Sequence, residues 1–124
     1  MPIIQPVEAP THELPATRFW QLACPSRGTR EASVWRVELA PGVEPVPHEL
    51  TREEILVVLE GTARATLAGV VEEVAAGGAI VVPAHTPFEL GVVGDEPVVA
   101  LAYLPVGGQA RVGNGEPFTP PWAQ

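Results

Sequence analysis

The chain has 124 residues and a formal charge of −8, with seven Arg, no Lys, fourteen Glu and one Asp. That length predicts a single domain with room for one substantial hydrophobic core. The lack of lysine excludes Schiff-base and lysine-anchored pyridoxal chemistry, and the acidic balance argues against a nucleic-acid partner, which requires a basic surface.

The N-terminal residues carry no recognisable targeting signal. Residues 1–10 have neither a basic region nor an apolar run, so no signal peptide is expected. No apolar stretch approaches the roughly 20 residues that span a bilayer. The single cysteine, Cys24, excludes an internal disulfide framework. We therefore expect a cytoplasmic protein with no membrane partner.

Short Val-rich segments between turn-forming residues are typical of an all-β sandwich or barrel. Fifteen prolines spread along the chain also disfavour long helices. Glu60-Gly61 and Ala68-Gly69 are predicted hairpin turns. In chain order, we expect strands over residues 17–22, 33–40, 54–59, 62–67, 70–74, 79–82 and 97–104.

The alternation of side chains predicts which strand faces are buried. In segment 33–40, Trp35, Val37 and Leu39 share one face, while the opposite face is charged, as in a half-exposed strand. Segment 54–59 is apolar on both faces. Because a small sandwich has one interior, the second apolar face needs another cover. The N-terminal arm or another subunit could supply it, and we expect a homodimer.

The last twenty residues, 105–124, are rich in Gly and Pro but contain two large apolar residues, Phe118 and Trp122. Such a tail could be disordered, or it could be an arm that packs on the barrel or on a partner. The two aromatic side chains favour the ordered arm.

Two segments, 41–61 and 77–90, carry Gly, His, Glu and Pro at regular spacings. They resemble the two motifs of the cupin family, G-x5-H-x-H-x3,4-E-x6-G and G-x5-P-x-G-x2-H-x3-N. The resemblance implies a cupin-type double-stranded β-helix, a jelly-roll barrel, over residues 33–104, preceded by an arm and first strand (1–32) and followed by the tail (105–124). The matching positions are Gly42, His48, Glu54, Gly61, Gly77 and Pro83.

The departures from the motifs concern the metal ligands. The resemblance implies one divalent metal ion held by three histidines and a glutamate. Leu50 stands at the second histidine, Phe88 at the last, and His85 at the glycine of the second motif. Only His48 and Glu54 remain as ligands at family positions. An apolar Leu50 would point at the ion, because positions 48 and 50 share a strand face.

The surviving polar residues suggest proton-transfer chemistry. His48 and Glu54 are both expected inside the barrel, where a hydrogen-bonded pair could act as general acid and base. We take these two as candidate catalytic residues, and Leu50, Phe88 and Tyr103 as the lining of a pocket for a small-molecule ligand.

Three functions stay open on this reading. The first is a metal-independent isomerase or lyase that uses the His/Glu pair on a carbonyl compound. The second is a dioxygenase-like enzyme in which His48, Glu54 and His85 hold a divalent metal weakly. The third is a non-catalytic ligand sensor or structural dimer. The sequence names no firm cofactor and no substrate.

Overall fold

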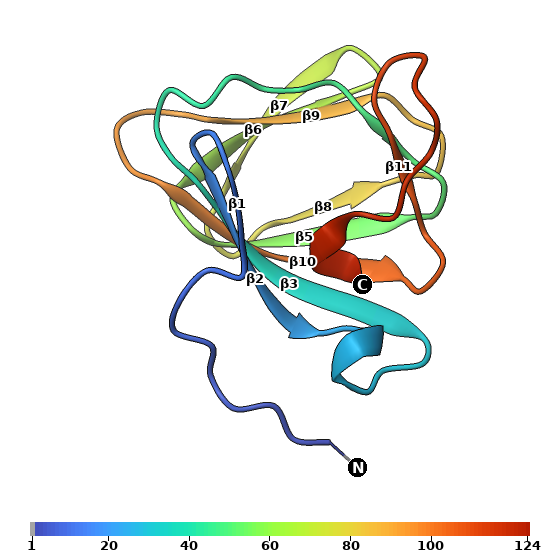
Figure 1. The fold of residues 1–124 in the computed structure, drawn as a ribbon. Coiled ribbons are helices and arrows are strands. Elements are labelled where there is room, and N and C mark those ends of the chain that lie inside the picture. Colours follow the sequence, from blue (N-terminus) through green and yellow to red (C-terminus); the bar gives the residue numbers. More distant parts are fainter. Residues whose placement is uncertain (1) are drawn as a thin grey trace.

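Two facing β-sheets enclose the interior of the protein (Figure 1). The computed structural model describes residues 2–124. One sheet has six strands in the order β1-β2-β3-β10-β5-β8, the other has three in the order β7-β6-β9, and β4 pairs with β11. A bridge between His48 and Phe88 ties the start of β4 to β9. The chain therefore forms the all-β jelly-roll barrel that the motifs imply.

The strands alternate with short turns and two single-turn 3₁₀ helices. The elements are β1 (His12–Leu14), β2 (Thr17–Ala23), η1 (Pro25–Arg27), β3 (Ala32–Leu39), β4 (Glu49–Leu50), β5 (Glu54–Glu60), β6 (Thr62–Leu67), β7 (Val70–Ala75), β8 (Ala79–Val82), β9 (Phe88–Val92), β10 (Val98–Pro105), β11 (Ala110–Arg111) and η2 (Pro121–Ala123). Across residues 2–124, none of the helical segments has the length and apolar character needed to cross a membrane.

All seven predicted strands are confirmed, and each end agrees to within one residue. The sequence reading missed β1, β4, β9 and β11. Three of these have only two or three residues, too few to show alternation. The fourth, β9, contains Gly91, and a glycine inside a strand weakens the β pattern.

The two predicted hairpin turns have different outcomes. Ala68-Gly69 joins β6 to β7 as expected: Leu67 pairs with Val70, and both turn residues have positive φ. The prediction for Gly61 was wrong. Here the chain leaves β5 in the six-stranded sheet and enters β6 in the three-stranded sheet. Gly61 has φ +79°, and a Cβ there would lie 2.3 Å from the carbonyl oxygen of Pro97.

On the inner face of the six-stranded sheet, large side chains of β3 lie beside small ones of β10. Trp35 pairs with Ala102 and Val37 with Ala100, and all four side chains are buried. The bulky ring and the two alanines share one layer of the interior, as packing at native density requires. The predicted inward face of β3 is therefore confirmed.

The C-terminal tail packs onto the barrel. Ala110 on β11 bridges to Phe118, and the buried hydroxyl of Ser33 donates a hydrogen bond of 2.7 Å to the carbonyl of Ala123. Trp122 stacks on Phe19 of β2, with ring centroids 3.7 Å apart and an interplanar angle of 6°. Of the two alternatives for this segment, the structure shows the ordered arm.

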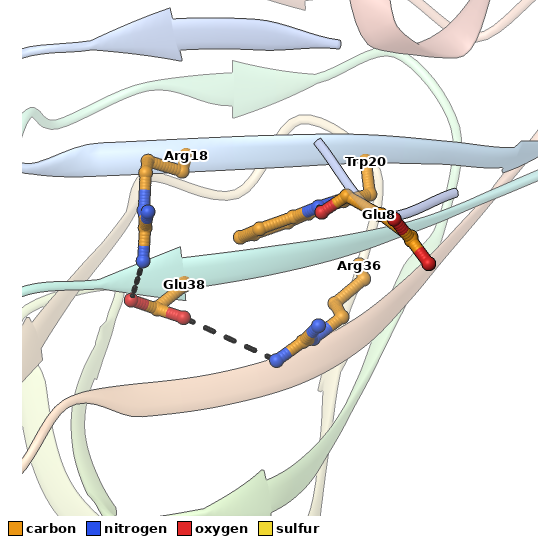
Figure 2. Close-up of polar contacts among 5 residues, drawn as sticks. All are labelled: Glu8, Arg18, Trp20, Arg36 and Glu38. Atoms are coloured by element: carbon orange, nitrogen blue, oxygen red, sulfur yellow. Dashed lines mark hydrogen bonds and ion pairs between the residues drawn. The ribbon is translucent and has the colours of Figure 1, made fainter. Parts of the chain in front are cut away.

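The N-terminal arm contacts β2 at Trp20, which is hydrogen-bonded to Glu8 of the arm (Figure 2). The indole Nε1 of Trp20 donates to the carbonyl of Glu8 at 3.1 Å. The guanidinium of Arg36 lies 4.6 Å from the indole ring and that of Arg18 lies 5.4 Å away. Glu38 accepts a hydrogen bond from Arg18 and pairs with Arg36 at 4.0 Å. Of these contacts, the hydrogen bond between Trp20 and Glu8 joins the arm to the charged part of the outer face.

The outer face of β5 and β8 is apolar and open to solvent. Val57, Leu59 and Val81 are 38%, 45% and 51% exposed, and Leu101 of β10 pairs with Val57. Sequence alternation predicted this second apolar face. The arm, which is fastened at β2, leaves it uncovered.

Candidate functional site

The interior of the barrel contains a cavity of about 270 Å³. Strands of both sheets, the segment 43–48, β11 and the C-terminal tail contribute to its wall. The wall is nearly all apolar, which is typical of a small-molecule site. Its main apolar members are Phe19, Trp35, Val37, Leu39, Leu56, Phe88, Leu90 and Trp122.

Glu54 places a carboxyl group in this apolar wall. It is the first residue of β5 and pairs with Val82 of β8, so alternation turns it inward with Leu56. Its exposed fraction is 6%, and it is the one charged residue buried among residues 2–124. Burial raises the pKa of Glu54 to about 8, because the ionised carboxylate loses its hydration. No hydrogen bond or ion pair within the described chain offsets that loss.

His48 lies at the edge of the same cavity, half-buried. Its backbone exchanges two hydrogen bonds with Phe88, at 2.9 and 2.8 Å. Its Nδ1 lies 2.8 Å from the carbonyl oxygen of Val46. Because a carbonyl can only accept, Nδ1 carries a proton, and in the neutral ring Nε2 is then the acceptor.

The structure brings His48 and Glu54 to one cavity but does not join them. No hydrogen bond or ion pair between the two side chains occurs in the part of the chain described. The hydrogen-bonded pair expected from the sequence is therefore replaced by two separate groups. The imidazole is hydrogen-bonded to the carbonyl of Val46 in the preceding loop. It makes an edge-to-face contact with the ring of Phe88, with ring centroids 5.4 Å apart.

The three residues expected to line the pocket have different positions. Phe88 is part of the wall. Leu50 is buried in the core, where it pairs with Ala110, and it does not reach the cavity. Tyr103 lies on the outer face of β10, opposite Ile55, because its inward neighbours Ala102 and Leu104 fix the alternation.

The residues at the family's metal-binding positions do not fit a divalent ion. Only His48 and Glu54 carry donor atoms, while Leu50 and Phe88 carry none. His85 sits on an exposed turn with φ 58° and is not part of the cavity wall. No group of three His, Cys, Asp or Glu side chains able to hold a metal occurs in residues 2–124.

Sequence reasoning missed Phe19, Trp35 and Trp122 as wall residues. Two of them carry a usable signal in the sequence: Trp35 belongs to the predicted inward face, and Trp122 is one of the two aromatic residues that favour an ordered tail. What the sequence did not show is that the tail folds back so that Trp122 meets Phe19.

The comparisons with known proteins agree with this barrel. The sequence profile of the cupin domain matches residues 35–104, and no curated protein matches the sequence. The polyketide cyclase RemF from Streptomyces resistomycificus is 26% identical, with a TM-score of 0.66 over 73% of this chain and 65% of that one. This chain thus spans slightly less than two thirds of that cyclase.

Two further solved structures share the fold at lower identity. A cupin-like protein from Thermotoga maritima is 21% identical, with a TM-score of 0.70 over 77% of this chain and 74% of that one. KdgF from Halomonas sp. is also 21% identical, with a TM-score of 0.67 over 77% and 86%. Since the family profile matches more than half of the residues and the barrel superposes on these structures, the chain belongs to the cupin family.

Proposed function

We propose that this cupin binds a small molecule in the barrel and catalyses a metal-independent proton transfer next to a carbonyl group, as an isomerase or lyase does. The observation that carries the proposal is the Glu54 carboxyl: buried, without a protein partner, and part of an otherwise apolar wall. A perturbed acid in a cavity is a candidate for catalysis on physical grounds.

Glu54 is suited to shuttle one proton. As a carboxylate it removes a proton from the carbon beside the carbonyl, and the electron pair of the broken C–H bond forms the enolate. As a carboxylic acid it then returns the proton to another atom of the same enolate. A pKa of about 8 populates both forms near neutral pH, which favours general acid–base catalysis.

His48 serves as the second proton-transfer group, at the cavity edge. With Nδ1 bonded to Val46, the Nε2 atom is the one available to a bound molecule. The similarity to a polyketide cyclase supports an enzyme that acts on a small organic molecule.

Deuterium uptake tests the proposal. Acetophenone is incubated with the protein in D₂O near the pKa of Glu54, and exchange at its methyl group is followed by NMR. We expect exchange above the buffer rate, and a decrease of about 100-fold or more for Glu54→Gln. Glu53→Gln is the matched control, because Glu53 is exposed and is not part of the cavity wall. A chelator should leave the rate unchanged.

Two results would contradict the proposal. Exchange that persists in Glu54→Gln would exclude Glu54 as the proton carrier. Exchange that disappears with chelator and returns with a divalent ion would favour the metal-dependent alternative.

A non-catalytic ligand binder is the second candidate. It is favoured by the separation of His48 from Glu54, because neither group orients the other as a catalytic base and its partner usually do. Ligand-induced stabilisation with no proton exchange for any ketone tested would support it.

A homodimer would supply the missing cover for the outer face of β5 and β8. The side chains of Val57, Leu59 and Val81 form an apolar surface there that a monomer leaves in water. A second copy meeting this face by two-fold symmetry would bury both surfaces at once.

A further inference from the structure

The cavity wall contains no positive side chain. Among the wall residues that the structure describes, Glu44, His48 and Glu54 are the titratable groups, and none is an arginine. The chain has no lysine, and its formal charge is −8. An anion entering this site would lose its hydration without gaining a cationic partner, and unpaired buried ions are strongly unfavourable.

A cation would also be a poor occupant. Its partner would be Glu54, but taking both ions out of water costs more than an ion pair returns unless further hydrogen bonds support it, and the buried Glu54 side chain makes none in the described chain. The remaining wall is mainly aliphatic, with Val37, Leu39 and Leu56 beside the rings. An uncharged molecule avoids both desolvation penalties.

Aromatic rings provide the flat surfaces of the wall. Phe19 and Trp122 are stacked in parallel, and Trp35 and Phe88 also line the cavity. Planar ring compounds gain from offset-stacked or edge-to-face contact with such rings, in addition to the burial of their area.

Glu54 is the main polar group in the cavity wall that is available to bind a ligand. Glu54 has no protein partner, whereas His48 already uses Nδ1 on Val46. A ligand with one buried polar group would therefore place it at Glu54: the acid form of the carboxyl donates to a carbonyl oxygen, and the ionised form is the base for the carbon next to that carbonyl.

We propose that the cavity selects uncharged, ring-containing ketones, with the carbonyl at Glu54 and the ring against the aromatic wall. The inference rests on the proposed proton transfer at Glu54 and names its substrate class. The cavity volume of about 270 Å³ lies just below the range of drug-sized sites, so the compound is small. Its far end meets an apolar rim that includes Leu14, Val46 and Val112.

A charge series tests the class directly. Three acetophenones differ only in the para group: a methyl ester, a carboxylate and a trimethylammonium. Affinity is measured by titration calorimetry or ligand-observed NMR. We expect the Kd of the ester to be at least about tenfold lower than the Kd of either ion. Equal or tighter binding of an ion, or no binding of the ester, would overturn the proposal.

A gain-of-charge variant provides an independent test. Val46→Arg adds a cation at the exposed rim, and we expect the affinity of the carboxylate relative to the ester to rise severalfold. Val71→Arg is the matched control, because Val71 is exposed on β7 away from the cavity. The proposal would be contradicted if the affinity of the carboxylate relative to the ester stayed the same in Val46→Arg. It would also be contradicted if that ratio rose equally in Val71→Arg.

The same compounds separate this inference from the proposed function. If the ester binds but takes up no deuterium, the ligand class holds and the proton-transfer proposal fails. If only the carboxylate exchanges its methyl protons, the proton transfer holds and the ligand class is wrong.

Discussion

Glu54 shows how one side chain can be in conflict with its surroundings. An ordinary surface glutamate is ionised at neutral pH, but Glu54 is buried beside Leu56 and Val82 and forms no ion pair within residues 2–124. The protein therefore keeps this carboxyl protonated to a higher pH than an unfolded chain would. Such a group is retained at the expense of stability, which is typical of functional sites.

The stability of the fold should depend on the protonation of Glu54. Below about pH 4.5 the carboxyl is neutral in both states. Between the ordinary pKa of 4.5 and the folded pKa of about 8, the unfolded chain ionises first, so the free energy of unfolding falls as pH rises. Glu54→Gln removes this dependence. We expect the variant to match the wild type at pH 4 and to exceed its free energy of unfolding by about 5 kcal/mol at pH 9.

Urea unfolding of both proteins across this range measures the difference. Because the two proteins share every other titratable group, the difference between them isolates the contribution of Glu54. A constant difference between the two proteins from pH 4 to pH 9 would show that Glu54 has an ordinary pKa.

At the scale of the elements, the turn between β5 and β6 determines whether the chain closes a barrel. Gly61 carries the chain from one sheet to the other with φ +79°, directly against the carbonyl of Pro97. Gly69, in the β6–β7 hairpin, has nearly the same φ, but a Cβ added there would meet open space. The two glycines thus differ in surroundings and not in backbone conformation.

Alanine substitution should separate these two effects. Gly69→Ala introduces only the strain of positive φ, about 1 kcal/mol. Gly61→Ala adds a Cβ that would lie 2.3 Å from a backbone oxygen, so we expect a loss above about 3 kcal/mol or failure to fold. Thermal unfolding of both variants gives the comparison, and equal losses would contradict the close approach at Pro97.

The C-terminal tail is part of the site as well as of the fold. Trp122 closes the cavity wall by stacking on Phe19. We expect Trp122→Ala to reduce the free energy of unfolding by about 2 kcal/mol, since the ring is only partly buried, and to weaken ketone binding. Phe118→Ala, which removes an exposed ring of the rim, should reduce stability by less than about 1 kcal/mol. Equal effects on stability would indicate that the stacked pair does not anchor the tail.

At the scale of the whole molecule, the outer face divides into two parts. Over β2 and β3 it is charged and held under the N-terminal arm, whereas over β5 and β8 it is apolar and open. The strand β10 lies between the two parts, and the proposed dimer would use the second one.

Val57→Arg tests whether a second copy covers this face. We expect light scattering coupled to size exclusion to show a dimer for the wild type and a monomer for Val57→Arg, because a buried unpaired cation is strongly unfavourable. Val70→Arg, on the exposed β7 strand of the other sheet, should remain dimeric. A monomeric wild type would rule the dimer out.

Local side-chain order and motif spacing were enough to predict the family and seven of the eleven strands that the structure describes. Alternation in segments such as 33–40 and 54–59 depends only on local side-chain order, and motif spacing marked His48 and Glu54. Which residues far apart in the sequence come into contact was visible only in the folded structure. It separated His48 from Glu54, turned Tyr103 outward through the register of β10, and brought Trp122 onto Phe19. Burial, and with it the pKa of Glu54, is a property of the assembled barrel, because desolvation depends on neighbours far apart in the chain.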